Sequence, residues 1–506
     1  MTLPIPLWRS GALLAAALLL SGCFNESDTA AQEGESDRIR LAMLQPPRSG
    51  LSPLSDDAFK LSRWSSAETL VVLDAAGDVR PALATEWQQL DATHWRFILR
   101  PNVQFHDGEA LTADAVVVAL RAAANAAPKP RILDGVTLTV EADGNGAVRV
   151  GTAGPDPLLP QRLSSPQLAI LSPHAYQANG VVNPVNTGSG PFVLRRVDGT
   201  SSAHLDRFDG YWGEKARASG IDASFVPDGA ARGAALRTGT ADLIEAIPVS
   251  QAPLLDPAQV HEVPMPRTNT LYLNTARGPL QDPALRAAVR NAIDRQSIVD
   301  NVYEGRADVA QGLLGPALAW AAPLRQPVDA PVAPADPAGR TLVLATFSDR
   351  AELPEVAVRL AQQLTAAGFT VKQVVREYAQ IEQDALAGKF DAFILSRATV
   401  LDSGDPVAYL YSDFSCAGSF NIAQLCRPEI DAALQQAAAI PAGEARRRAI
   451  MAAERLILAS DAAIPMLHER VIQGESPRLR HALRDPRERQ LIDSQTQRLS
   501  AADAAP

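Results

Sequence analysis

The sequence predicts a mixed α/β protein built of more than one lobe, and three observations support this prediction. The chain has 506 residues, which is more than one simple hydrophobic core normally supports. Its 46% hydrophobic and 21% charged residues are typical of a folded protein rather than a disordered one. Strand and helix patterns mix from the start of the chain and alternate in its later half, as expected for lobes built on open sheets.

The first half contains short strands and one clear helix. The stretch Ile39–Met43 (IRLAM) predicts the strand that opens the fold. Residues 93–100 alternate apolar and polar side chains like a half-buried strand, and residues 112–124 suit a helix with Thr112 as its cap. Two further strands within 137–150 are joined by Asp143-Gly144-Asn145-Gly146, a strong hairpin signal.

The later half alternates strands and helices more regularly. The expected strands are 191–197, 202–208, 270–273, 341–346, 370–375 and 390–394. The expected helices are 282–294 and 352–367, with a largely helical stretch over 427–469. Residues 264–269 (PMPRTN) are expected to form a loop where two domains join.

Charge and motif content exclude several classes of protein. There are 57 acidic against 47 basic residues, a net charge of -10, whereas a nucleic-acid binder needs a basic face. No run of eighteen apolar residues follows the first twenty, so no later transmembrane helix is expected. The seven histidines form no spaced ligand cluster, and GxSxG, HExxH and P-loop motifs are missing. The sequence therefore predicts no catalytic residue, metal or cofactor.

The N-terminus has the form of a secretory signal over residues 1–22. Arg9 precedes the apolar block 11–20, and Leu20-Ser21-Gly22-Cys23 follows at once. A cysteine directly after Leu-Ser-Gly resembles the lipobox of bacterial lipoproteins, in which Cys23 is lipidated and becomes the mature N-terminus. Residues 23–38 would then contain the lipidated cysteine and a flexible acidic tether. The alternative is an ordinary signal peptide whose cysteine happens to lie at the boundary.

The other two cysteines, Cys416 and Cys426, remain as a pair in an exported, oxidising compartment. This favours a disulfide between them. A metal site is the alternative, but no histidine lies between Asp402 and Arg427, and two thiols alone make a poor zinc ligand set.

Several motifs occur in the order and spacing of one known family. In the first half these are Pro81–Ala84 with Trp87, Trp95–Arg100, Val103–Gly108 (VQFHDG), Leu111–Val116 (LTADAV), Asn186–Phe192 (NTGSGPF) and Tyr211–Gly213 (YWG). In the second half Leu271–Asn274 (LYLN) is followed by Arg286 and Ala292–Arg295 (AIDR). Over roughly residues 39–475 the chain resembles the extracytoplasmic solute-binding proteins of ABC importers, in the family (family 5) that includes oligopeptide-, dipeptide- and nickel-binding proteins.

The resemblance implies an α/β, two-lobed periplasmic-binding-protein type II fold with an extra domain in the first lobe. The core domain of lobe 1 would consist of residues 39–53, 172–265 and 471–500, the extra domain of 54–171, and lobe 2 of 266–470. Two strands would cross between the lobes, near 265–273 and 466–473, and the cleft would shut over a ligand.

The resemblance also implies where a ligand would bind. Peptide binders of this family hold the ligand's amino group with an aspartate a few residues before an acidic-Pro pair, and Asp402 takes that place before Asp405-Pro406. The alternative is that Asp402 only caps the turn. The sequence departs from the family pattern at 390–400, which is about two residues long and has no tryptophan. Arg397 and Arg267 are candidates for a ligand carboxylate, since a guanidinium suits bidentate pairing, although a surface arginine is the alternative for each.

The expected function is that of a lipid-anchored substrate-binding protein of an ABC importer. It would capture a peptide or similar small polar solute by lobe closure and deliver it to the transmembrane subunits of a permease. We expect a monomer in the periplasm of the cell envelope that contacts the membrane through its lipid anchor only, binds no nucleic acid and is not an enzyme. The alternatives are uptake of a nickel chelate, opine or metallophore on the same fold, or an envelope hydrolase.

Overall fold

The computed structural model describes residues 37–133, 135–328, 331–350, 352–400 and 404–500. The predicted signal peptide, Cys23, residues 24–36 of the tether and Asp402 therefore lie outside the described residues. In the part of the chain that the structure describes, no helix is both long enough and apolar enough to cross a membrane.

Most strands belong to one long mixed sheet. Its order is β15 (Thr370–Arg376), β14 (Thr341–Phe347), β16 (Ala392–Ala398), β12 (Val260–Leu273), β17 (Ala463–Glu475), β11 (Leu243–Ile244), β1 (Ile39–Met43), β10 (Gly220–Phe225), β9 (Ser202–Arg207) and β8 (Phe192–Asp198), while β13 (Ala307–Val309) also pairs with β17. A second sheet has the order β4 (Ala84–Gln89), β5 (His94–Leu99), β7 (Ala147–Thr152) and β6 (Leu138–Ala142). Two short hairpins are β2 (Val71–Leu73) with β3 (Val79–Pro81), and β18 (Leu479–Arg480) with β19 (Gln497–Arg498).

Some of the helices begin at a residue whose side chain caps them, and several bury an apolar face. The α-helices are α1 (Ala58–Arg63), α2 (Ala113–Asn125), α3 (Leu159–Arg162), α4 (Gly229–Arg237), α5 (Pro283–Ala292), α6 (Arg295–Val302), α7 (Ala321–Leu324), α8 (Glu352–Ala366), α9 (Tyr378–Leu386), α10 (Val407–Phe414), α11 (Pro428–Ala439) and α12 (Glu444–Ala459). Thr112 caps α2 as predicted, because its hydroxyl accepts the Ala115 N–H at 3.2 Å. Helix α8 buries Leu353, Leu360 and Leu364 on one face.

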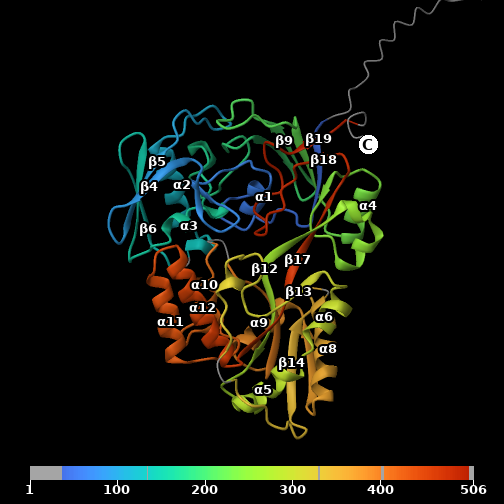
Figure 1. Ribbon diagram of the computed structural model, residues 1–506. Coiled ribbons are helices and arrows are strands. Elements are labelled where there is room, and N and C mark those ends of the chain that lie inside the picture. The colour runs from blue at the N-terminus through green and yellow to red at the C-terminus, as the bar shows by residue number, and fades with distance from the viewer. Residues whose placement is uncertain (1–36, 134, 329–330, 351, 401–403, 501–506) are drawn as a thin grey trace, which may run out of the picture. The chain divides into compact units, whose positions relative to one another are not determined.

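Two long strands, β12 and β17, connect the upper and lower parts of the sheet in Figure 1. They pair antiparallel from Val260 with Gly474 to Tyr272 with Ala463, with register shifts between Pro264 and Thr268 and between Asn269 and Thr270. The predicted loop at 264–269 is therefore wrong: these residues lie within β12, because β17 supplies a backbone partner on both sides of the first shift. The end of the predicted helical stretch 427–469 is wrong for the same reason, since residues 463–469 belong to β17.

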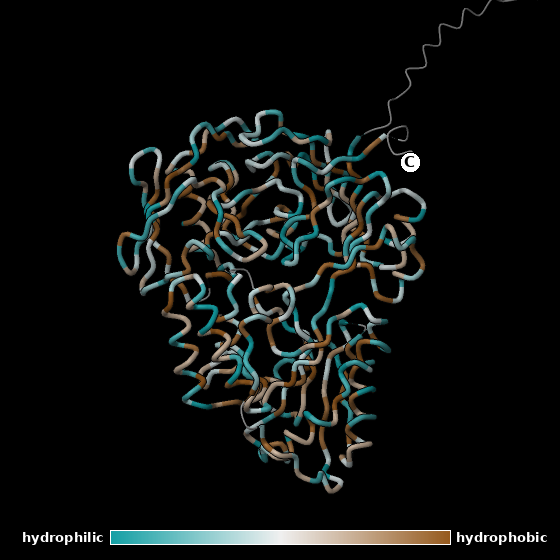
Figure 2. The backbone as a smooth tube through the Cα atoms, viewed as in Figure 1, coloured by the Kyte–Doolittle hydropathy of each residue, from teal (hydrophilic) through white to brown (hydrophobic). Residues whose placement is uncertain are grey.

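Apolar side chains form separate cores on the two sides of this pair. The largest core takes its residues from the range 271–467, a second from 70–170, and a third from 39–64, 192–243 and 479–492. Along the tube in Figure 2, hydrophobic residues gather on the strands and hydrophilic residues at many of the turns. The predicted domain boundaries stay a proposal, and the third core includes Leu61 and Trp64 from the segment assigned to the extra domain.

Candidate ligand-binding site

A cavity of about 560 Å³ is lined by both lobes and by β12 between them. Lobe 1 contributes Phe59, Arg63, Arg131 and Pro486–Glu488, β12 contributes Met265–Arg267, and lobe 2 contributes Phe347, Asp349, Arg350, Tyr378, Leu395–Ala398, Val400 and Phe420. A second cavity, of about 880 Å³, shares Arg131, Arg397 and Phe420 with the first, so the two adjoin. Small-molecule sites in proteins have volumes of roughly 300–1,000 Å³, so either cavity is large enough for a small solute.

The lobe 2 wall lies at the carboxyl ends of parallel strands. Strand β14 is parallel to both β15 and β16, and the cavity-lining residues of this wall other than Phe420 end these three strands or follow closely after them. In open α/β sheets, ligands bind at this edge, where loops bring side chains from several strands together. The fold therefore places this part of the cavity where a ligand site is expected.

Arg397, at the end of β16, is held by a buried carboxylate. Its Nε and Nη2 donate to the two oxygens of Asp413 at 3.0 and 2.9 Å, and Asp413 is 0% exposed. Burial opposes the charge of Arg397, but the Asp413 carboxylate raises the pKa of this guanidinium above its ordinary value. The ring of Phe420 lies 4.2 Å from the guanidinium, a distance typical of a cation–π contact. The Arg397 side chain is therefore fixed in the cavity wall.

Arg267 and Arg350 share a single carboxylate at the point where the strands cross. Glu469 of β17 accepts from Nη1 of Arg350 at 2.5 Å, and its Oε2 lies 4.0 Å from Nε of Arg267. Arg267 also donates to the Ser396 carbonyl at 3.3 Å. Burial, together with the nearby charge of Arg350, lowers the pKa of Arg267. Two guanidinium groups therefore face the cavity with one carboxylate between them.

The lobe 1 wall presents basic groups held by the protein itself. Arg63 of α1 pairs with Glu245 at 3.1 Å, and Arg487 donates to the carbonyls of Leu73 and Asp74 at 3.1 and 2.5 Å. Glu488 has a φ of 52°, a left-handed backbone conformation that a residue with a side chain rarely adopts. Such conformations often occur where a loop is shaped for binding, and Glu488 lines the cavity.

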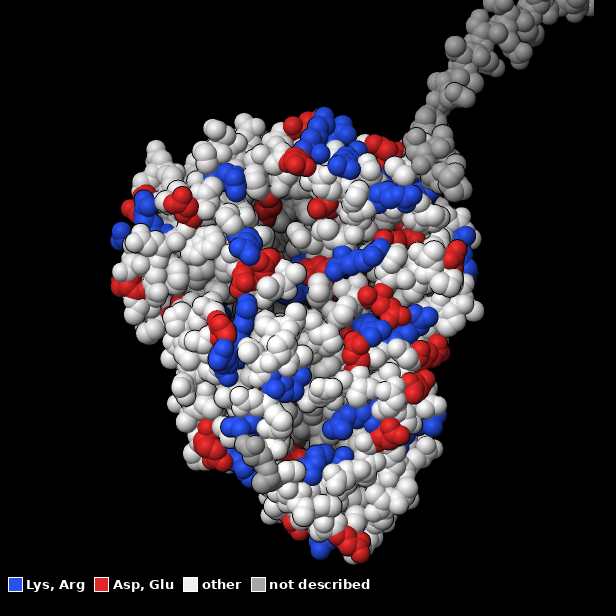
Figure 3. All heavy atoms as spheres, viewed as in Figure 1, with Lys and Arg blue, Asp and Glu red and all other residues white. Residues whose placement is uncertain are grey.

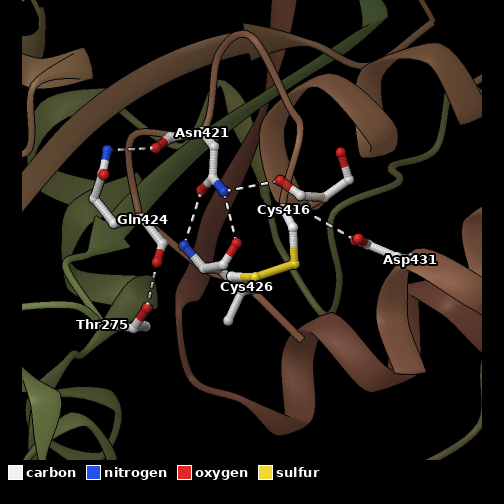
Figure 4. Close-up of a disulfide and its surroundings, with 8 residues drawn as sticks. Thr275, Cys416, Asn421, Gln424, Cys426 and Asp431 are labelled. Atoms are coloured by element: carbon white, nitrogen blue, oxygen red, sulfur yellow. Dashed lines mark hydrogen bonds between the residues drawn. A yellow bond between two sulfur atoms is a disulfide. The ribbon is translucent and has the colours of Figure 1, made fainter. Parts of the chain in front are cut away.

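A disulfide closes the loop that presents Phe420 to the cavity. Cys416 and Cys426 are joined with an S–S distance of 2.13 Å (Figure 4). Inside this loop the Asn421 side chain donates to the carbonyl of Ser415 and both accepts from and donates to the backbone of Leu425. The loop is therefore held by covalent and hydrogen bonds at the edge of the site.

The two predicted arginines lie in the same cavity, although they are 130 residues apart in the sequence. That they bind a ligand stays a prediction. Asp402 lies outside the described residues, while Asp405 nearby is held by Arg446, whose Nε lies 2.7 Å from its Oδ2. Arg350 was not predicted; its position just after a β-strand was the available signal. Within the described residues, no group of three His, Cys, Asp or Glu side chains is arranged to hold a metal.

Two lobes joined by crossing strands, with a cavity between them at the ends of parallel strands, define a two-lobed binding protein of the periplasmic type II class. A family model described as bacterial extracellular solute-binding proteins, family 5 Middle, matches residues 78–421. The chain therefore belongs to family 5 of the bacterial extracellular solute-binding proteins, the substrate-binding components of ABC transporters.

Individual relatives bind different solutes. A probable di/tripeptide-binding protein of Pseudomonas aeruginosa is 28% identical over 447 residues, covering 79% of this chain and 84% of that protein. A nickel-binding periplasmic protein of Escherichia coli is 28% identical over 269 residues, about half of each chain (50% and 51%). Among solved structures, a nickel ABC transporter protein from Bacillus halodurans matches with a TM-score of 0.77 at 23% identity, covering 91% of this chain and 100% of that one. A periplasmic binding protein from Helicobacter pylori in complex with a peptide matches with a TM-score of 0.70 at 20% identity, covering 93% and 99%.

Proposed function

We propose that this protein captures a peptide or similar small polar solute between its lobes and delivers it to the transmembrane subunits of an ABC permease. The observation that supports the proposal most directly is the 560 Å³ cavity, which is lined by both lobes and by β12. A solute that contacts both lobes stabilises their closed arrangement over the open one. The permease would then recognise the closed form.

We further propose that the mature protein is a monomer that begins at Cys23 and is held at the membrane in the periplasm by acyl chains on that residue. Each buried methylene contributes about 0.8 kcal/mol, so several chains hold a protein at a membrane without a spanning helix. In this role the protein performs no chemical turnover, in keeping with relatives that are solute-binding components of transporters.

Uptake of a nickel chelate, opine or metallophore is the alternative on the same fold. Relatives that bind nickel have a similar fold. The arginines of the cavity suit the carboxylates of a chelator better than they suit a bare metal cation. The alternative therefore differs from the main proposal in the solute and not in the mechanism.

A thermal-shift screen tests the proposal. Protein starting after Cys23 would be unfolded and refolded to remove any bound solute, then mixed with di- to pentapeptides, glutathione, opines and chelated nickel. A ligand present at about 100 times its Kd adds about 2.7 kcal/mol of stability, which is easily seen as a rise in Tm. Small-angle X-ray scattering with the same ligand should show a smaller radius of gyration. Hydrolysis of any of these compounds by the pure protein would contradict the proposal.

A further inference from the structure

The crossing strands hold a polar cluster that is incompletely paired. Glu469 and Asn269 are 6% and 0% exposed. Among the described residues, Nε of Arg267, Oε1 of Glu469 and Oδ1 of Asn269 are buried without a hydrogen-bond partner. A buried polar group left unpaired costs about 1–3 kcal/mol. Nε of Arg267 lacks an acceptor, whereas these oxygens of Glu469 and Asn269 lack a donor. The unpaired Nε therefore indicates a place where an acceptor group binds.

The charge of the cavity indicates which kind of group would bind. Its lining includes six arginines, at positions 63, 131, 267, 350, 397 and 487, against two carboxylates, Asp349 and Glu488. The chain as a whole has the opposite balance, with 57 acidic and 47 basic residues. On the face that Figure 3 shows, basic and acidic side chains are interspersed rather than gathered. The basic lining is therefore a local property of the cavity.

Buried carboxylates balance only part of this charge. Asp413 pairs with Arg397 and Glu245 pairs with Arg63, one to one. Glu469, however, serves both Arg350 at 2.5 Å and Arg267 at 4.0 Å. At the crossing strands two guanidinium groups thus share the one carboxylate of Glu469, with Glu488 as a further carboxylate that acts on Arg267, and Nε of Arg267 has no hydrogen bond.

We propose that the cavity selects an anionic solute with at least two carboxylate groups, and that Arg267 and Arg350 bind one of these carboxylates in competition with Glu469. The inference rests on the proposed function and names its substrate class. An anion at this position supplies the acceptor that Arg267 lacks. Because Arg267 lies on β12 and Glu469 on β17, the anion also changes the pairing between the two strands that connect the lobes.

If Glu469 competes with the solute for Arg267 and Arg350, removing its charge should strengthen binding. A Glu469 with a purely structural role would not give this result. In Glu469→Gln the negative charge beside the solute is lost while the side-chain shape is kept. At a separation of about 5 Å even a partly screened like charge weakens binding, so the variant should bind an anionic probe about tenfold more tightly. If Glu469 instead received a positively charged group of the solute, the same variant would bind more weakly.

Isothermal titration calorimetry with charge-matched probes tests the substrate class. One series is the dipeptides Ala-Glu, Ala-Gln and Ala-Lys, and the other is citrate, its triamide and nickel(II) citrate. We expect the anionic member of at least one series to bind at least tenfold more tightly than its neutral counterpart. Preference in the first series identifies an acidic peptide, and preference in the second a free or chelating polycarboxylate.

Three variants assign the residues. Arg267→Gln and Arg350→Gln should each weaken binding of the preferred anionic probe by about 10- to 100-fold. Arg448→Gln is the matched control, because the Arg448 side chain is 68% exposed and pairs with Glu444 on the surface of α12. This variant should bind the anionic probe as tightly as the unmodified protein does. Circular dichroism checks that each variant is folded.

The outcomes separate the substrate class from the general function. Binding of Ala-Gln, Ala-Lys or the triamide with no preference for the anion overturns the inference and leaves the proposed function in place. Weaker binding of the anionic probe to Glu469→Gln also overturns the inference. If no probe binds and native mass spectrometry of the purified protein finds no solute, both proposals fail.

Discussion

The pair of Arg397 and Asp413 offers a direct test of how the cavity wall is built. Asp413 is 0% exposed and accepts hydrogen bonds from Nε and Nη2 of Arg397 and from the Tyr272 hydroxyl, the last at 3.1 Å. Asp413→Asn removes the negative charge and leaves Arg397 without its counter-ion. Breaking a buried ion pair on one side costs about 3–5 kcal/mol. Because the Arg397 side chain is 21% exposed and partly hydrated, we expect the lower end, about 3 kcal/mol.

Urea unfolding of the chain starting after Cys23 measures this cost. Far-UV circular dichroism and tryptophan fluorescence should be followed together, because coincident transitions justify a two-state free energy. Arg397→Gln should lose a similar amount, since it leaves the Asp413 carboxylate buried without a cation beside it, although the hydroxyls of Tyr272 and Ser412 still donate to it. The double variant should lose less than the sum of the two single losses, by about 2 kcal/mol, because both changes break the same interaction.

An exposed ion pair on α12 provides the control for the buried pair. Arg448→Gln, which breaks an exposed pair on α12, should leave the urea midpoint unchanged. If Asp413→Asn shifts the midpoint no more than this control does, the pair does not stabilise the wall. Strictly additive losses in the double variant would show that the two side chains do not act together.

Three further predictions concern other parts of the molecule. Replacing Cys416 and Cys426 by serine opens a loop of about ten residues and should cost about 3 kcal/mol in urea unfolding, an effect that reduction of the unmodified protein should reproduce. Burial lowers the pKa of His468 to about 4, so this residue stabilises the fold above pH 6.5, and its contribution of about 3 kcal/mol is lost as the pH falls from 6.5 to 4. The stability difference between His468→Gln and the unmodified protein should therefore change over this range, and a constant difference would refute the assignment. Asp402→Asn should weaken Ala-Glu binding by about 3–5 kcal/mol in calorimetry, whereas equal affinity would remove Asp402 from the site.

Local signals predicted those elements whose structure depends on neighbouring residues. Strand β1 has the predicted bounds Ile39–Met43, and Thr112 caps α2 as its position before the helix indicated. The turn at 143–146 joins β6 to β7, because residues that tolerate left-handed backbone form a hairpin with little help from the rest of the chain. The family motifs extended these signals to the two-lobed class.

Pairing between distant strands explains why the predictions for residues 264–269 and 463–469 were wrong. Residues 264–269 contain two prolines and no regular alternation, so local pattern predicted a loop, yet β17 and β16 hold parts of this stretch in a strand. The segment 463–469 follows a long helix, and its membership of β17 depends on partners some 200 residues away. A strand's backbone hydrogen bonds lie outside its own segment, so its existence depends on what the fold places beside it.

The sequence by itself determined the class of the protein, the type of those strands and helices that have a clear local pattern, and two of the arginines of the cavity. Only the tertiary structure decided that Arg267, Arg350 and Arg397 face one cavity and that Glu469 is divided between two of them. The physical reason is that an arginine has the same local chemistry on a surface as in a cleft. Whether an arginine lines a binding site depends on its burial, on its distance to other charges and on how many groups share its partner. These properties are set by the pairing of strands that are distant in the sequence.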